Sequence, residues 1–119
     1  MKTDNIHDLF DKIDEIGYRT VPQNVLFAYK NGDIGYYLGA MMPKRKNPSP
    51  FSGCRVHDGR TSDNDWEGIH DASDLPRVIN PKKGYIVTAN NRPAPEHSRL
   101  DIGATSTSTI RAQRITELL

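Results

Sequence analysis

The stretch NVLFAYKNGDIGYYLG, residues 24–39, decides what this chain can fold into. Both of its halves are rich in aromatic and branched side chains, which favour β-strands. Between them, Asn31-Gly32 is a pair that adopts positive φ angles easily, as a two-residue hairpin turn requires. The sequence therefore predicts a β-hairpin, with antiparallel strands at residues 25–30 and 34–39 joined by a two-residue turn at Asn31-Gly32.

Residues 5–17, upstream of the hairpin, have the pattern of an amphipathic helix. Their apolar side chains recur at the spacing of one helical face, and they are Ile6, Leu9, Phe10, Ile13 and Ile16. Asn5 is a suitable N-cap and Gly17 a suitable stop. Because the opposite face is polar, we expect this helix to cover a larger apolar surface, such as a sheet.

Two further elements follow the hairpin. Residues 85–89 form a short apolar run that ends at Asn90-Asn91, which predicts a strand in the hairpin's sheet or in a neighbouring one. Residues 109–119 have a helical pattern. On the helical projection Arg111 falls inside the apolar stripe, where an arginine is costly to desolvate unless it is paired.

The stretch between these elements, residues 41–83, is interrupted by Pro and Gly throughout, which predicts a long excursion with short elements. Trp66 is the side chain best suited to anchor this excursion to a core. Structureless segments of this length are uncommon unless they are functional or supported, so we expect a missing partner chain. Cys54, the single cysteine, is expected to be a small buried hydrophobe.

The 119 residues fit one domain with a modest core, because 35% are hydrophobic and 26% are charged, at a mean hydropathy of −0.68. The net charge is +1, which is not the footprint of a protein that binds nucleic acid or an anionic membrane. No apolar run approaches a membrane span, and no signal-peptide core follows Met1. We expect neither nucleic acid nor membrane as a partner, and the compartment stays open.

No complete catalytic constellation is visible in the sequence. The histidines lack metal-ligand spacing, and they are His7, His57, His70 and His97. The run LPRVINPKKGYIVTANNRP, residues 75–93, stands out instead. A strand that ends in Asn90-Asn91 would place carboxamides at the open end of a sheet, where loops often carry function. From spacing alone, a plain turn is the favoured interpretation of these two asparagines.

Several motifs, taken in order, resemble the penicillin acylase family of N-terminal-nucleophile hydrolases, in the later part of its catalytic β chain. Each motif alone is weakly specific, but their order and spacing together are specific, and residues 1–21 carry little of the resemblance. The motifs are the hairpin from Gln23 to Tyr36, Gly39 with Pro43-Lys44-Arg45, Asp65-Trp66-Glu67-Gly68, residues 75–93, and RAQRITELL at residues 111–119.

This resemblance implies an α+β fold, a fragment of the family's αββα sandwich, with a β-hairpin, a further strand and N- and C-terminal helices. It also implies an amidohydrolase that cleaves acyl amides such as penicillins, cephalosporins or acyl-homoserine lactones. By motif, Asn90 resembles the family's oxyanion-hole asparagine, and Arg111 the arginine near that asparagine and the nucleophile. A carboxamide suits the first role, because it donates to a developing alkoxide without burying a charge.

In this family the nucleophile is a serine that heads the β chain, and its own α-amino group acts as the base through water. Met1 is no such residue, so we expect residues 1–119 to be a single partial domain that is inactive alone. Its partners would be the nucleophile-bearing segment and α chain of an acylase, and a small acyl-amide substrate. The alternative is a non-catalytic scaffold or binding module derived from the same fold.

The resemblance implies no cofactor for the chain itself, but some family members bind a structural calcium. Asp101 falls near an aspartate that they use for it. The segment around Asp101 departs from the family's pattern. Residues 105–109 depart from it as well, because family members usually have an aromatic side chain just before the helix that carries the arginine.

Overall fold

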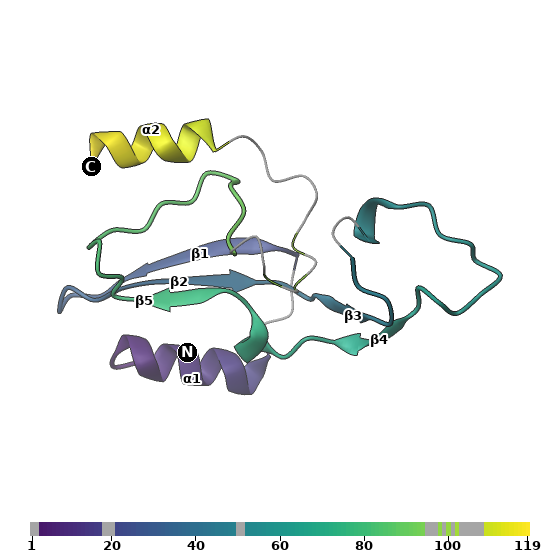
Figure 1. Cartoon of the computed structure of the whole chain (residues 1–119). Coiled ribbons are helices and arrows are strands. Elements are labelled where there is room, and N and C mark those ends of the chain that lie inside the picture. Colours follow the sequence, from purple (N-terminus) through teal and green to yellow (C-terminus); the bar gives the residue numbers. More distant parts are fainter. Residues whose placement is uncertain are drawn as a thin grey trace. The chain divides into compact units, whose positions relative to one another are not determined.

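The computed structural model describes residues 3–17, 21–49, 52–94, 98, 100, 102 and 109–119. Contacts divide the chain into two compact units, Met1–Met41 with His70–Ile86 and Met42–Ile69 with Val87–Leu119. Helices and strands are mixed along the chain, which confirms the predicted α+β class. The elements in order are α1 (Ile6–Ile16), β1 (Gln23–Ala28), β2 (Ile34–Gly39), β3 (Pro43–Arg45), the 3-10 helix η1 (Ser52–Cys54), β4 (Trp66–Ile69), the 3-10 helix η2 (Ala72–Asp74), β5 (Arg77–Ile79) and α2 (Ile110–Leu118) (Figure 1).

The helix α1 begins and ends where the sequence predicts. The side-chain oxygen of Asn5 accepts a hydrogen bond from the Asp8 amide at 2.9 Å, which satisfies one N–H group of the first turn. Gly17 ends the helix at φ 62°, a left-handed conformation that suits glycine, and its amide donates to the Ile13 carbonyl at 3.0 Å. The predicted apolar face is buried except for Ile16, which is 68% exposed.

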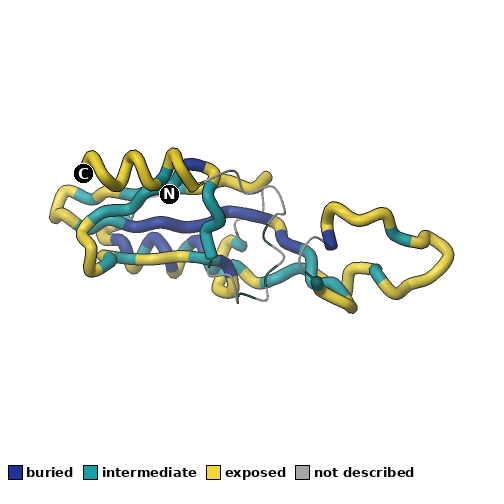
Figure 2. Tube along the Cα trace, turned by 45° about the horizontal axis from the view of Figure 1, so that its top comes forward, coloured by how far each residue is buried: buried dark blue, intermediate teal, exposed yellow. Residues whose placement is uncertain are grey.

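In the first unit, β1, β2 and β5 form an antiparallel sheet in the order β1-β2-β5, and α1 lies along one face of it (Figure 1). The central strand β2 is buried almost throughout (Figure 2). The ring of Phe10 in α1 meets Phe27 and Tyr37 edge-on, at 5.9 and 6.1 Å between ring centroids. Gly35 allows this close packing, because a Cβ there would lie 2.6 Å from Ile6 Cδ1.

The hairpin forms at the predicted place, but its loop is longer than predicted. The Tyr29 amide donates to the Asp33 carbonyl, and the Gly32 amide donates to the Tyr29 carbonyl, both at 2.9 Å. Gly32 has a φ of 93°, whereas Asn31 is not at positive φ. The loop is therefore a β-turn followed by a glycine bulge, and the prediction of a two-residue turn at Asn31-Gly32 is wrong. The Asn31 side chain accepts from the Asp33 amide at 3.2 Å, which favours this wider loop.

The third strand of the sheet is β5, and the prediction of a strand at residues 85–89 is wrong. β5 pairs with β2, so that Val78 lies opposite Tyr36. Residues 85–88 pair with no strand in the described part of the chain. These residues are half-buried although they form no strand–strand hydrogen bonds, and their burial accounts for their apolar character.

Asn80, directly after β5, ties the sheet to the hairpin loop. Its amide donates to the Ile34 carbonyl and its side-chain oxygen accepts from the Ile34 amide, both at 2.9 Å. Its side-chain nitrogen donates to Asp33 Oδ1 at 2.8 Å. This hydrogen bond, together with one from Asn31, holds the pKa of the Asp33 carboxyl below its usual value.

In the second unit, β3 and β4 form a two-stranded antiparallel ribbon. Trp66 begins β4 and is 57% exposed, with the Arg45 guanidinium 5.9 Å from its ring centre. The prediction that Trp66 anchors the excursion to a core is therefore wrong within this chain, where the indole is covered only in part. Cys54 is exposed as well, which corrects its predicted burial. The excursion itself, with short elements, is confirmed.

The helix α2 forms where predicted, yet none of its residues is buried. Ile110 and Leu118 are each 70% exposed and Ile115 is 40% exposed, as the colouring of this helix in Figure 2 indicates. Arg111 is exposed too, so the expected desolvation of its charge within the stripe does not occur in this chain. Among the described residues, no helix is both long and apolar enough to cross a membrane.

Candidate functional site

Asn90 lies in a tight bend of the second unit, and its backbone is left-handed, with φ 62°. This conformation costs most L-residues about 1–2 kcal/mol, although asparagine visits it more readily than others do. Asn90 is exposed, whereas Ala89 before it is only 5% exposed. Asn90 is therefore an exposed residue in a bend whose first residue is buried.

Arg111, in the first turn of α2, reaches this carboxamide. Its Nη1 donates a hydrogen bond to Asn90 Oδ1 at 3.2 Å, which brings the two candidate residues together across 21 positions of sequence. A guanidinium carries donors only, so the atom that faces it must be the carboxamide oxygen. The amide NH2 is then the opposite end of the Asn90 side chain, and it is the end that can donate.

Two neighbours of Asn90 make contacts that sequence reasoning missed. Asn91 Oδ1 accepts a hydrogen bond from the Ala89 amide at 3.0 Å, and Arg92 Nη1 donates to the Ile102 carbonyl at 2.9 Å. Asn91 therefore bonds to the backbone of the bend, whereas Asn90 faces α2. The available signal was the residue type, because asparagine side chains commonly bond to nearby backbone in turns.

This arrangement puts a neutral donor beside a permanent cation. A carboxamide does not titrate, and a guanidinium stays protonated in proteins. The hydrogen bond from Arg111 polarises the Asn90 amide, and polarised groups in a chain of hydrogen bonds strengthen one another. Both groups would stabilise negative charge that develops on an oxygen beside the NH2. The pair therefore joins a neutral hydrogen-bond donor to a cation, and neither side chain is a nucleophile or a base.

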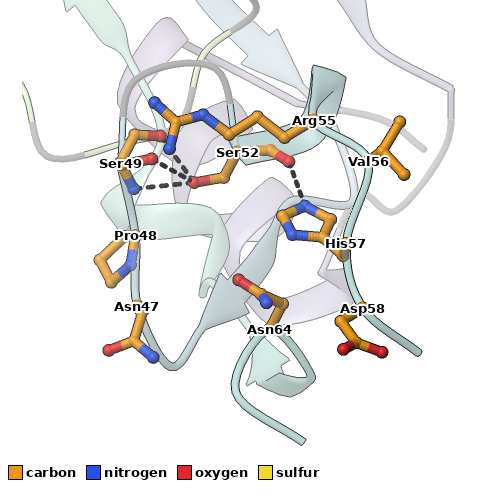
Figure 3. A pocket seen from close by; sticks show the side chains of 9 residues that line it. All are labelled: Asn47, Pro48, Ser49, Ser52, Arg55, Val56, His57, Asp58 and Asn64. Carbon is orange, nitrogen blue, oxygen red and sulfur yellow. Dashed lines mark hydrogen bonds between the residues drawn. The ribbon is translucent and has the colours of Figure 1, made fainter. Parts of the chain in front are cut away.

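The second unit has a hollow of about 570 Å³ (Figure 3). Its lining is mainly polar, and a carboxylate, an arginine and an imidazole all contribute to it. The lining residues are Asn47, Pro48, Ser49, Ser52, Arg55, Val56, His57, Asp58 and Asn64. Beside the hollow, the Arg60 side chain donates to Asp58 and holds the pKa of that carboxyl below its usual value.

Ser52 and His57, which both line this hollow, do not form a catalytic pair. The Ser52 hydroxyl donates to the Ser49 carbonyl at 2.7 Å and accepts from the Ser49 amide at 2.8 Å. His57 Nε2 contacts the Ser52 carbonyl at 2.7 Å and not the hydroxyl, as the dashed lines in Figure 3 mark. The imidazole is thus not placed to take the hydroxyl proton, and these contacts fold the loop.

Asp101, the candidate calcium ligand, lies outside the described residues. Where the chain is described, no three His, Cys, Asp or Glu side chains gather closely enough to hold a metal ion. The calcium site therefore stays a prediction from the resemblance.

Comparison with known proteins identifies the family. The penicillin amidase family model matches residues 1–119. The penicillin acylase 2 proenzyme of Pseudomonas sp. (strain SE83) is 30% identical over 103 residues, which are 87% of this chain and 13% of that protein. The acyl-homoserine lactone acylase QuiP of Pseudomonas syringae pv. syringae (strain B728a) is 28% identical over 114 residues, which are 96% of this chain and 13% of that protein.

A solved structure agrees with these sequence matches. The thermostable penicillin G acylase from Alcaligenes faecalis matches with a TM-score of 0.60 and 29% identity, over 82% of this chain and 16% of that one. The chain thus spans 13% of the length of the two curated relatives. Because a family model covers all of its residues, the chain belongs to the penicillin amidase family.

Proposed function

We propose that this chain supplies the oxyanion-stabilising part of an acyl-amide hydrolase, with Asn90 as the donor and Arg111 as the residue that orients it. The observation that carries the proposal is the 3.2 Å hydrogen bond from Arg111 Nη1 to Asn90 Oδ1. The relatives are named for penicillin and for acyl-homoserine lactones, in both of which an amide joins an acyl group to an amine. The proposed substrate is therefore a small acyl amide.

The chemical role of Asn90 follows from where charge develops. In acyl transfer, the substrate's carbonyl oxygen becomes negative as the tetrahedral intermediate forms, and the Asn90 NH2 donates a hydrogen bond to it. This donor is neutral, so it costs less than a charged one to desolvate when substrate covers it. The hydrogen bond strengthens as the charge grows, so it lowers the barrier more than it tightens substrate binding.

Arg111 acts through Asn90. By donating to Oδ1 it fixes which end of the carboxamide faces the substrate, and its charge makes that end a better donor. A flipped carboxamide would present its oxygen to the oxyanion, and the two oxygens would then repel each other. The arginine prevents this flip.

The nucleophile and the base are proposed to come from another segment. The proposed partners of residues 1–119, taken as a single partial domain, are the nucleophile-bearing segment and the α chain of an acylase. In support, the chain covers only 13% of the length of its relatives. The complete acylase, in which the proposal is tested, is this chain together with those segments.

Replacing Asn90 with Gly in the complete acylase tests the proposal. Glycine adopts φ 62° without strain, so this variant removes the carboxamide and leaves the bend intact. We expect kcat for an acyl anilide to fall about a hundred- to a thousandfold, the loss typical of one oxyanion donor. KM should change much less. Asn90→Ala should lose at least as much, because it adds backbone strain.

Asn91→Ala is the matched neighbour. Its loss of kcat should be far smaller, because the Asn91 side chain bonds to backbone and not to substrate. If Asn91→Ala were the more damaging of the two, the donor would be assigned one residue too early. If neither substitution changed kcat, the oxyanion role would be refuted and a non-catalytic module would be favoured.

A further inference from the structure

The bend at Asn90 is closed by the side chain that follows it. Asn91 Oδ1 accepts the hydrogen bond of the Ala89 amide at 3.0 Å, so the residues before and after Asn90 are tied to each other. Asn90 between them has φ 62°. One side chain thus spans the left-handed residue and links its two neighbours.

This tie meets two physical needs of the bend. A left-handed non-glycine residue persists only where its surroundings hold it there. Ala89 is only 5% exposed, and an amide N–H that is shielded from water is costly to leave without a partner. The Asn91 oxygen provides that partner, and in doing so it stabilises the left-handed conformation of Asn90.

The backbone conformation of Asn90 decides where its side chain points. In the observed conformation Asn90 Oδ1 meets Arg111 Nη1 at 3.2 Å. If the bend relaxed to an extended conformation, the Cα–Cβ bond of Asn90 would turn and this contact would be lost. The direction of the donor therefore depends on a hydrogen bond that Asn90 itself does not make.

We propose that Asn91 is a positioning residue, whose side-chain oxygen holds Asn90 in the orientation that an oxyanion donor needs. The inference rests on the proposed function of Asn90. It assigns opposite chemical requirements to two identical neighbouring residues: position 90 needs a donor, whereas position 91 needs an acceptor.

Aspartate separates these requirements, because it keeps the acceptor oxygen of asparagine and loses the NH2 donor. In the 119-residue chain, the readout is hydrogen exchange of the Ala89 amide, followed by NMR. We expect Asn91→Ala to speed this exchange about fivefold to tenfold, the effect of one lost hydrogen bond. Asn91→Asp should leave the exchange rate close to that of the unmodified chain. Equal exchange in all three proteins would overturn the inference.

In the complete acylase, the kinetics of Asn91→Ala and Asn91→Asp are compared with those of Asn90→Asp. We expect Asn91→Ala to lower kcat about tenfold at unchanged KM, and Asn91→Asp to restore most of it, because a positioned donor acts on the transition state. Asn90→Asp should restore nothing relative to Asn90→Gly. An Asn91→Asp variant as slow as Asn91→Ala, or a loss that appears in KM and not in kcat, would overturn the positioning role.

The two proposals fail in different ways. If Asn90→Gly and Asn90→Asp kept full kcat, the oxyanion role would be refuted, while exchange at Ala89 would still decide whether Asn91 holds the bend. If the Asn90 variants lost kcat and Asn91→Ala did not, the oxyanion role would stand and the positioning role would be refuted.

Discussion

A carboxamide has a donor end and an acceptor end of nearly equal size, so its value in a site depends on which end faces the ligand. For Asn90 this choice is made by Arg111, which can only donate and therefore takes the oxygen. The resemblance to a family pointed to both residues. Their contact could not be read from periodicity, because it joins a bend to a helix 21 positions away.

Arg111→Leu measures what this orientation is worth in the complete acylase. Leucine fits the apolar stripe of α2, so we expect folding to survive. A hydrogen bond to a charged group contributes about 1.5–3 kcal/mol, so kcat should fall about ten- to a hundredfold. Steady-state kinetics with an acyl anilide, beside a thermal melt, check this outcome.

Arg114→Leu is the matched control on the same helix. Arg114 is 66% exposed and donates to Glu117 at 3.2 Å, so its pair is a surface one with little effect on stability. Its removal should leave kcat within about twofold, as for a surface site away from the reaction. A large loss at Arg114 with none at Arg111 would place the orienting arginine one turn further along α2.

At the scale of elements, the local residue pattern predicted where helices and hairpin strands form, but not which strands pair in the sheet. The cap at Asn5 and the stop at Gly17 set the limits of α1, and the strand-forming runs set the hairpin. The strand at residues 85–89 failed because a strand exists only where another strand pairs with it. That partner is a property of the whole fold, and the short β5 holds the place in the sheet instead.

The link between β5 and the hairpin loop predicts a dependence on pH. Hydrogen bonds from Asn80 and Asn31 lower the pKa of Asp33 in the folded chain. The folded state therefore binds fewer protons than the unfolded state, and the contribution of Asp33 to stability is present above the unfolded pKa, about 3.9. It is lost as the pH falls through the lower, folded pKa.

A double-mutant cycle of Asp33→Asn and Asn80→Ala isolates this contribution from the other carboxyls. The coupling free energy between the two positions, from urea unfolding of the chain, should favour the folded state at about pH 6 and become smaller as the pH falls through the folded pKa of Asp33. Asn80 Nδ2 donates to Asp33 Oδ1 at 2.8 Å. If the coupling free energy were the same at every pH, the charge of Asp33 would have no part in this contact.

At the scale of the whole molecule, residues of both units include large apolar side chains that are exposed. Leu26 of β1 is 50% exposed, and Ile110 and Leu118 of α2 are each 70% exposed. Only 35% of the residues are hydrophobic, so the chain has few apolar side chains for a core of its own. Such surfaces fit the proposed partner segments, which would cover them.

The purified 119-residue chain should not hydrolyse phenylacetyl or longer acyl anilides above background, because the proposal places nucleophile and base elsewhere. Release of the aniline, followed by absorbance, checks this on a preparation whose folding is verified by circular dichroism. Turnover that survived purification and was abolished by Ser52→Ala or Cys54→Ala would refute it, since those variants alter nucleophilic side chains within the chain itself.

Trp66 gives the chain a built-in optical reporter. It is the single tryptophan, it is 57% exposed, and the nearby arginine leaves much of its ring in contact with water. An indole in water emits at longer wavelength than one in an apolar contact. Any segment that covers the β3–β4 ribbon will therefore move the emission toward the blue, so that assembly can be titrated on the unlabelled protein, without a dye or a tag.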